Sequence, residues 1–263
     1  MRRRSKTIVL ILLALFLLPI AVRAALATFE EHPQSWRTAD WSSIGGLPAA
    51  SRHPAARILI LSARTGRWKG IFATHSWVVL KRENAPAWTR YDVVGWGNPV
   101  RTNGWAPDGR WYGDKPMVVA DVSGAQAGAL IPRIEAAIRG YAFAKAGDYR
   151  VWPGPNSNTF VAAILRAVPE LGATLPPTAI GKDFRPWPFI GLSDSHTGLE
   201  ASVWGVLGVK IGWVEGIELN FLGLVAGLDL RQPGIKLPGF GYFGFGGGTA
   251  FAAPSGADAT VSD

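Results

Sequence analysis

Residues 153–165 read PGPNSNTFVAAIL, a turn-rich segment that leads directly into an apolar, helix-like stretch. Proline and glycine mark the turn, while asparagine and serine are favoured where a helix begins. Apolar residues then recur on one face of the expected helix, and Pro169 ends it. These apolar residues are Phe160, Val161, Ile164, Leu165 and Val168. The pattern predicts a helix with one buried face that begins close to Asn156.

The preceding part of the chain predicts a sheet and another helix. From Ser123, a plausible cap, apolar residues recur at helical spacing as far as Tyr141, and Pro132 should kink or split this helix. Strand candidates are residues 57–62, 72–81, 88–94 and 117–121. A turn at residues 84–86 would pair Arg82 with Trp88. We therefore predict an α+β fold in which the helices pack on an antiparallel sheet.

Beyond Pro176 the composition changes to apolar segments that are interrupted by glycine. Residues 199–230 contain no run of about 18 apolar residues, which disfavours the alternative of a membrane-embedded helix. The glycines instead indicate short strands with tight turns. We expect Glu215 and Glu218 to face solvent or to cap turns. Residues 246–263 are small and polar without periodicity, and we expect them to be disordered.

The first 27 residues have the order of a secretory signal or a membrane anchor. Four basic residues precede position 7, an apolar run follows from Ile8 to Val22, and small residues follow up to Ala27. The charge distribution places the basic end in the cytoplasm and the rest of the chain outside. Cleavage and retention as an anchor both stay open, and a buried core helix is the alternative. We expect a bacterial inner-membrane protein with a periplasmic domain, or a periplasmic protein.

The overall charge does not indicate nucleic-acid binding. The net charge of +8 falls to +3 beyond residue 27, because five basic and no acidic residues lie in the first 27 positions. The chain has no cysteine, which excludes disulfides, a lipid-modified cysteine and a thiol nucleophile. Its four histidines (His32, His53, His75 and His196) are scattered. We therefore predict neither a metal site nor a cofactor.

Two segments without a regular pattern flank the first strands. Residues 28–56 are polar and turn-rich, and we expect them to form a loosely packed linker. Residues 95–116 combine three tryptophans and Tyr112 with many turn residues, which predicts a long structured loop. This loop could bind a ligand, or it could form a satellite hydrophobic cluster. The expected domain boundaries are thus 1–27, 28–56, 57–245 and 246–263.

His75 and Ser157 are the residues on which chemistry could depend. His75 lies at the start of an expected strand, and Ser157 lies at the start of an expected helix. A nucleophile at a helix N-terminus faces unpaired N–H groups and the positive end of the dipole, both of which favour a developing oxyanion. A nearby histidine can accept its proton. Alternatively, Ser157 or Asn156 simply caps the helix, and His75 is a hydrogen-bonded residue at a strand end.

Three strings carry a resemblance to known families. They are THSWVVLK (74–81), PGPNSNTFVAAIL (153–165) and IELNFLGLVAGLDLRQPGIKLPGFG (217–241). Together they resemble the family known as domain of unknown function 3750, over most of residues 57–245. More distantly, a strand histidine followed by Asn-nucleophile-x-x-Phe on a helix is similar to the circularly permuted papain-like superfamily. That superfamily includes lecithin:retinol acyltransferases and cell-envelope amidases, so the resemblance implies a papain-like sheet with packed helices.

The papain-like resemblance implies roles for individual residues. His75 matches the general base, and Ser157 stands where the superfamily has cysteine. A serine hydroxyl ionises less readily than a thiol, so it needs a better aligned base and a stronger oxyanion hole. Asp92 is the nearest carboxylate for the third position. The expected pairing of Arg82 with Trp88, however, places Tyr91 on the face of His75 and Asp92 on the opposite face.

Two functions follow from these expectations. In the first, the domain is an envelope hydrolase or acyltransferase that acts on an amide or ester of peptidoglycan or lipid. Its substrate contacts are expected to come from Asn156, Asn158, Trp77, Trp111 and Tyr112. In the second, it is a non-catalytic envelope protein that keeps the fold and binds a ligand or partner through the tryptophan-rich loop. A cleft that holds both Ser157 and His75 would favour the first.

Overall fold

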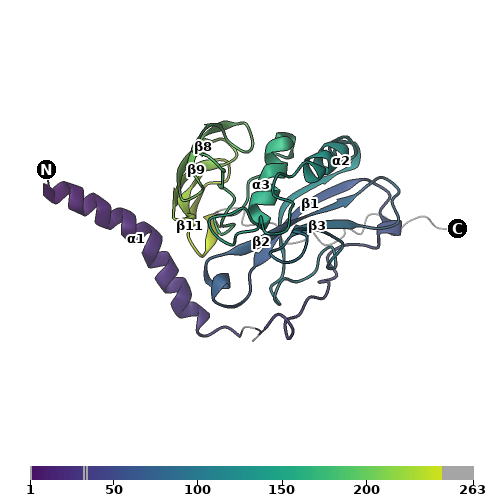
Figure 1. Ribbon diagram of the computed structural model, residues 1–263, viewed down its shortest axis with the longest axis horizontal. Helices are drawn as coiled ribbons and strands as arrows, with labels where there is room; N and C mark the ends of the chain where they lie inside the picture. The colour runs from purple at the N-terminus through teal and green to yellow at the C-terminus, as the bar shows by residue number, and fades with distance from the viewer. Residues whose placement is uncertain (1, 32, 34, 245–263) are drawn as a thin grey trace.

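A computed structural model of the protein describes residues 2–31, 33 and 35–244. Within these residues the chain forms three α-helices and two antiparallel sheets, which confirms the α+β class (Figure 1). The expected disordered tail, residues 246–263, lies outside the described residues.

The first sheet has five strands in the order β4-β3-β2-β1-β5. Their bounds are Arg57–Arg64 (β1), Thr74–Lys81 (β2), Thr89–Val93 (β3), Val100–Thr102 (β4) and Met117–Ser123 (β5). Helices α2 (Gly124–Arg139) and α3 (Ser157–Ala167) pack on one face, and α2 is continuous through Pro132. The other face is covered by residues 95–116 and by part of residues 35–56. Because both faces are covered, β1 and β2 are almost entirely buried.

Residues 35–56 pack more closely on this sheet than a loose linker would. Trp41 lies against Trp111 with ring centroids 5.0 Å apart, in an edge-to-face arrangement. Arg110 pairs with Asp40 at 3.0 Å, and Asp108 accepts a hydrogen bond from Ser43 at 2.6 Å. The segment therefore completes the cluster of tryptophans on this face.

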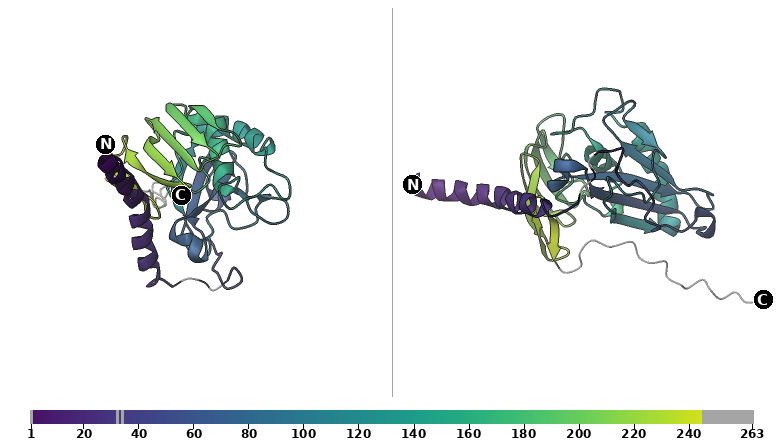
Figure 2. Two further views of the ribbon diagram at one scale, coloured as in Figure 1. Left: turned by 60° about the vertical axis from the view of Figure 1, so that its left-hand side comes forward. Right: turned by 90° about the horizontal axis from the view of Figure 1, so that it is seen from below.

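The second sheet is a meander in which every strand pairs with its sequence neighbour, in the order β12-β11-β10-β9-β8-β7-β6. Its strands are Phe189–Leu192 (β6), Gly198–Val203 (β7), Leu207–Gly212 (β8), Gly216–Phe221 (β9), Leu224–Asp229 (β10), Gly234–Leu237 (β11) and Gly241–Gly244 (β12). This confirms that the glycine-rich region forms short strands. The sheet stands beside α3 and the end of the first sheet (Figures 1 and 2).

Helix α1 (Arg2–Ala27) contains the apolar N-terminal run. Its window Leu10–Ala27 is long and apolar enough to cross a membrane, by length and composition. The C-terminal half of α1 contacts the rest of the chain through residues such as Phe16 and Ile20. The N-terminal half projects away from the second sheet (Figure 2, right).

Candidate functional site

The first turn of α3 is capped by Asn156 and not by Ser157. The side-chain oxygen of Asn156 accepts hydrogen bonds from the backbone N–H groups of Asn158 (2.9 Å) and Thr159 (3.1 Å). The hydroxyl of Thr159 in turn accepts from the backbone N–H of Asn156 at 3.1 Å, which completes a capping box. Ser157 is the first helical residue, and no described residue hydrogen-bonds to its hydroxyl or its backbone N–H. Of the two capping alternatives, the one that assigns the cap to Ser157 is therefore wrong.

Side-chain amides fix the start of α3 against β2. Nδ2 of Asn158 donates to the carbonyls of Thr74 (2.9 Å) and Ile180 (2.8 Å), and Nδ2 of Asn156 also donates to Ile180 at 3.0 Å. Thr74 directly precedes His75, so these bonds hold the helix N-terminus beside the histidine strand. Gly181 lies so close that a Cβ there would be 2.3 Å from Nδ2 of Asn156.

His75 belongs to a buried hydrogen-bonded chain with Asp92 and Arg90. Nε2 of His75 lies 2.9 Å from Oδ1 of Asp92. Arg90 donates to both carboxylate oxygens, at 2.7 and 2.8 Å, and its third nitrogen donates to the carbonyl of Ala106 at 2.7 Å. Both Asp92 and Arg90 are fully buried. The bond with Asp92 leaves Nδ1 as the ring nitrogen without a hydrogen-bond partner among the described residues.

The expected position of Asp92 on the opposite face is wrong, because the strand register differs by one residue. Strand β2 pairs with β3 so that Val78 faces Tyr91 and Leu80 faces Thr89, not with Arg82 opposite Trp88. A shift of one residue moves every side chain of a strand to the other face. Asp92 thereby shares a face with His75, and Tyr91 packs against the core beneath the helices.

Two tryptophans pack against the hydrogen-bonded residues His75, Asp92 and Arg90. The indole of Trp111 stacks on the imidazole of His75, with centroids 3.6 Å apart and planes 6° from parallel. The guanidinium of Arg90 lies over the ring of Trp77 at 4.0 Å. Trp77 is fully buried, so the expectation that it contacts substrate is wrong. Trp77 can pack against Arg90 because the side chains at positions 75 and 77 point to the same face of β2.

Burial and hydrogen bonding set the protonation states of His75 and Asp92. Burial lowers the pKa of His75 from its ordinary value, and the hydrogen bond to Asp92 opposes this only in part. Burial by itself would raise the pKa of Asp92, but the bond with His75 and the charge of Arg90 lower it overall. At neutral pH, His75 is therefore a neutral base beside an ionised aspartate.

Ser157 and His75 line one cavity of about 680 Å³, which we call the His75 cavity. It opens at the start of β2, where Trp111 and Tyr112 from the tryptophan-rich loop and residues 156–158 from α3 form its walls. Ile20 of α1 and two leucines of the second sheet, Leu222 and Leu224, also line it. No direct hydrogen bond joins Ser157 to His75. The walls are mainly apolar, which suits a ligand with a hydrocarbon portion.

A model of the family described as protein of unknown function (DUF3750) matches residues 55–184. Residues 55–184 of the chain therefore carry the domain of this family. No curated protein and no solved structure matches the chain. The DUF3750 region contains the first sheet, α2 and α3, and it ends before β6. The third string of the resemblance, residues 217–241, therefore lies outside the matched region, and the papain-like similarity stays a prediction.

The DUF3750 region supplies the polar residues of the site. Asn156, Ser157, Asn158, His75, Trp111 and Tyr112 all line the His75 cavity. Asp92 contacts His75 but does not line the cavity, and the fully buried Trp77 does not line it either. Sequence reasoning missed Arg90, although its position two residues before Asp92 places both on one strand face. No group of three His, Asp or Glu side chains within the described residues is arranged to hold a metal ion, and the prediction of no cofactor stays a prediction.

Proposed function

We propose that this DUF3750 protein is a membrane-attached hydrolase or acyltransferase, with Ser157 as nucleophile and His75 as general base. One observation carries the proposal. The hydroxyl of Ser157 is not used by the helix cap, and it lies at the helix N-terminus in a cavity shared with a neutral, aspartate-held histidine. Pure capping would have left Ser157 bonded to its own helix.

The chemistry follows from these positions. Nδ1 of His75 takes the hydroxyl proton as Oγ of Ser157 attacks the carbonyl carbon of an ester or amide. The backbone N–H of Ser157, which lacks a partner within the described residues, donates to the oxyanion at the positive end of α3. The carbon–oxygen or carbon–nitrogen bond then breaks, and the leaving group takes the proton from His75. Water or an acceptor alcohol releases the acyl group from Ser157.

Asp92 and Arg90 act through His75 in this proposal. Asp92 holds the imidazole in one orientation and stabilises the imidazolium that forms during attack. Arg90 keeps Asp92 ionised and fixed through its two hydrogen bonds. Asn156 and Asn158 position the helix, while Trp111 and Tyr112 form walls of the substrate site. Stacking on Trp111 further restrains the ring that must meet the hydroxyl.

The surroundings of the cavity favour a lipid substrate over peptidoglycan. Ile20 on α1 reaches the cavity from the helix that could cross a membrane, and Leu222 and Leu224 add apolar wall. An acyl chain fits such walls, whereas a glycan strand would need polar partners. The basic residues at the N-terminus favour an orientation in which the domain lies on the outer side of a bacterial inner membrane. The substrate class is therefore an ester or amide of a membrane lipid.

The test is covalent labelling of the full-length protein in detergent with a fluorophosphonate. We expect wild type to be labelled, and both Ser157→Ala and His75→Gln to lose labelling. Ser123→Ala, which replaces an exposed serine at the start of α2, is the matched control and should label like wild type. Because the chain has no cysteine, Ser157→Cys can be probed with iodoacetamide without background labelling.

The outcomes separate catalysis from ligand binding. Labelling of Ser157→Cys that depends on His75 would support the nucleophile position. Labelling that persists in Ser157→Ala would contradict it. No labelling in wild type or in the cysteine variant, with unchanged thermal unfolding, would favour the non-catalytic envelope protein.

A further inference from the structure

The second sheet has its charged residues inside and its apolar residues outside. Along β8, Leu207, Val209 and Ile211 are exposed, whereas Lys210 between them is buried. Along β9, Glu218 is buried and Leu219 is exposed. Glu215 and Glu218 are both buried, so of the two expected roles the solvent-facing one is wrong, whereas Glu215 does accept hydrogen bonds from the turn at Ser195. A sheet in water normally shows the reverse alternation.

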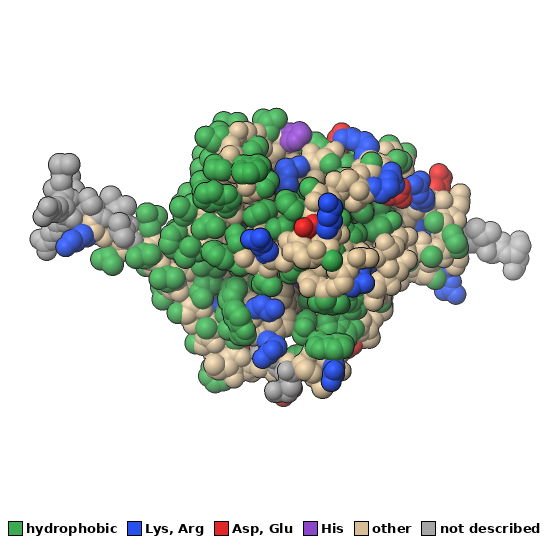
Figure 3. Space-filling view, viewed as in Figure 1, with side chains coloured by type: hydrophobic (Ala, Val, Ile, Leu, Met, Phe, Trp, Pro, Cys, Tyr) green, Lys and Arg blue, Asp and Glu red, His purple; other side chains and the backbone are tan. Residues whose placement is uncertain are grey.

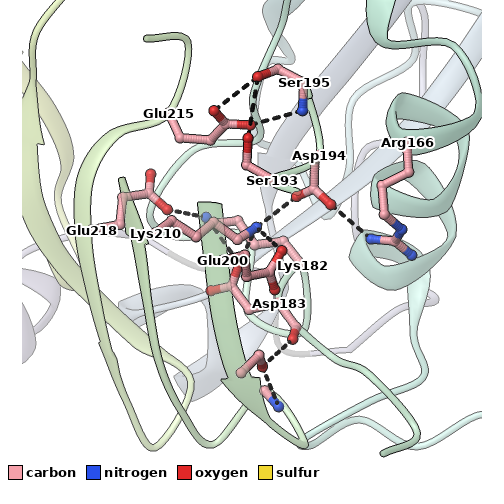
Figure 4. A network of polar contacts seen from close by, with 12 residues as sticks. Arg166, Lys182, Asp183, Ser193, Asp194, Ser195, Glu200, Lys210, Glu215 and Glu218 are labelled. Carbon is pink, nitrogen blue, oxygen red and sulfur yellow. Dashed lines mark hydrogen bonds and ion pairs between the residues drawn. The ribbon is translucent and has the colours of Figure 1, made fainter. Parts of the chain in front are cut away.

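On the inner face the charged side chains pair mainly with one another and with charges of residues 182–195. Glu200, Lys210 and Glu218 lie on adjacent strands in one row of the register. Lys210 pairs with Asp194 at 2.6 Å and with Asp183 at 2.8 Å, and Glu218 pairs with Lys182 (Figure 4). Glu218 also pairs with Lys236 at 2.7 Å. Glu215 accepts hydrogen bonds from the backbone and the hydroxyl of Ser195. These pairs connect the sheet to residues 182–195, and Arg166 of α3 reaches Asp194.

The outer face is a continuous apolar surface, which we call the outer sheet face. The register aligns one row of it across six strands: Leu199, Ile211, Ile217, Leu228, Ile235 and Phe243. No charged residue interrupts this row. Leu199 is 64% exposed and Ile190 on the edge strand is 88% exposed. Hydrophobic side chains cover this part of the molecule in Figure 3. A patch of this extent on a protein is typical of an interaction surface.

Helix α1 already covers one corner of the outer sheet face. Phe16 of α1 is buried against Phe221, with ring centroids 5.6 Å apart, and Phe221 pairs with Leu207 on the outer side. The leucines of α1 beyond this contact are exposed, as in Leu10 (65%) and Leu18 (62%). The apolar surface of the sheet is therefore continuous with that of a helix that can cross a membrane.

We propose that the outer sheet face lies on the lipid bilayer that α1 enters, with its side chains in the hydrocarbon boundary of the outer leaflet. The projection of α1 away from this sheet allows the helix to enter the bilayer while the sheet rests on its surface (Figure 2, right). Trp204 and Trp213, exposed at the two ends of β8, have the amphipathic rings that favour the headgroup region. Burial in lipid explains why the apolar side of the sheet is outermost.

This docking also places the His75 cavity at the membrane surface. Leu222 and Leu224 at the β9–β10 turn and Ile20 of α1 line both the cavity and the junction of the sheet with the helix. The docking rests on α1 being a membrane helix, as in the proposed function, but it does not depend on Ser157 being a nucleophile. The experiment below therefore measures docking without any activity.

Single cysteines carrying a nitroxide test the docking in the full-length protein, which has no native cysteine. We place them at Ile211 and Ile235 on the outer sheet face and at Leu18 on α1. The control is Ala146, an exposed residue in the loop between α2 and α3. The protein is reconstituted in vesicles of phosphatidylethanolamine and phosphatidylglycerol. The measurement is the collision rate of each label with oxygen, which concentrates in lipid, and with a water-soluble nickel chelate.

We expect the labels at positions 211 and 235 to have the same collision rates as the label at position 18. Their rates of collision with the nickel chelate should be several-fold below that of the label at position 146. Thermal unfolding of each labelled protein should match wild type, which ensures that the labels report the native fold. If 211 and 235 resemble 146 while 18 is in lipid, the docking is rejected and the anchor remains. Spin–spin broadening at 211 and 235 that disappears on mixing with unlabelled protein would show a second copy on this face and would also overturn the proposal.

Discussion

Replacing Asn156 by alanine should destabilise the protein strongly, whereas Ser157→Ala should be nearly neutral. The side-chain oxygen of Asn156 accepts from two backbone N–H groups, and the loss of such a cap costs about 1 kcal/mol. Its Nδ2 donates to the carbonyls of Val151 and Ile180, and the lost bonds add roughly 1–2 kcal/mol. The total is about 2–3 kcal/mol. The hydroxyl of Ser157 has no hydrogen bond to a described residue, and alanine favours helix by about 0.5 kcal/mol.

The assay is thermal unfolding of full-length variants in detergent, followed by tryptophan fluorescence. For a chain of this size 1 kcal/mol shifts the Tm by about 2–4 °C, so Asn156→Ala should lower it by roughly 4–12 °C. Ser157→Ala should stay within about 2 °C of wild type. A loss for Ser157→Ala as large as for Asn156→Ala would refute the assignment of the cap and give Ser157 a structural role. Loss of labelling without loss of stability gives it a chemical one.

Three further predictions concern buried ionisable groups. Asp92→Asn should destabilise the protein by about 3–5 kcal/mol in the same assay, because it leaves the fully buried Arg90 without its counter-charge; a loss below about 1 kcal/mol would contradict this. By NMR the pKa of His75 should lie below 6.5 in wild type, because burial lowers it, and a higher value would show that burial is not dominant. The pKa of His75 should fall further in Asp92→Asn, since the bond to Asp92 raises it, and an increase in this variant would contradict that role of Asp92. Burial raises the pKa of Glu200 from 4.5 to about 7, so the folded state holds its proton more tightly and loses stability as pH rises through that window. Between pH 5 and pH 8 the unfolding temperature should therefore fall more for wild type than for Glu200→Gln. An equal fall in the two proteins would show that Glu200 does not titrate in this way.

The helices could be predicted because their pattern is local. Phe160, Ile164 and Leu165 recur with helical spacing, and in the structure they form the core face of α3. The pairing of Asn156 with Thr159 could have been recognised as a capping pattern, since its spacing is that of a capping box. The position of Ser157 beside a histidine strand was also expected from the two motifs, and both residues line one cavity.

The partners of His75 could not be predicted, because they depend on the register between two strands. One residue of difference in the β2–β3 turn decides whether Asp92 or Tyr91 shares a face with His75. The same is true of Trp77, whose position under Arg90 follows from the face it occupies and not from its chemical type. Nothing in the sequence of a seven-residue turn specifies its pairing uniquely.

The sequence by itself determined the α+β class, the apolar N-terminal helix and the short strands of the glycine-rich region, because each depends on residues close together in the chain. Only the tertiary structure decided which face of the second sheet is inside. Alternation along β8 and β9 separates Lys210 and Glu218 from their apolar neighbours, but it does not say which set is buried. The buried set is the charged one, because Lys182, Asp183 and Asp194 lie in the segments before and after β6, which fold against this face and pair with its charges.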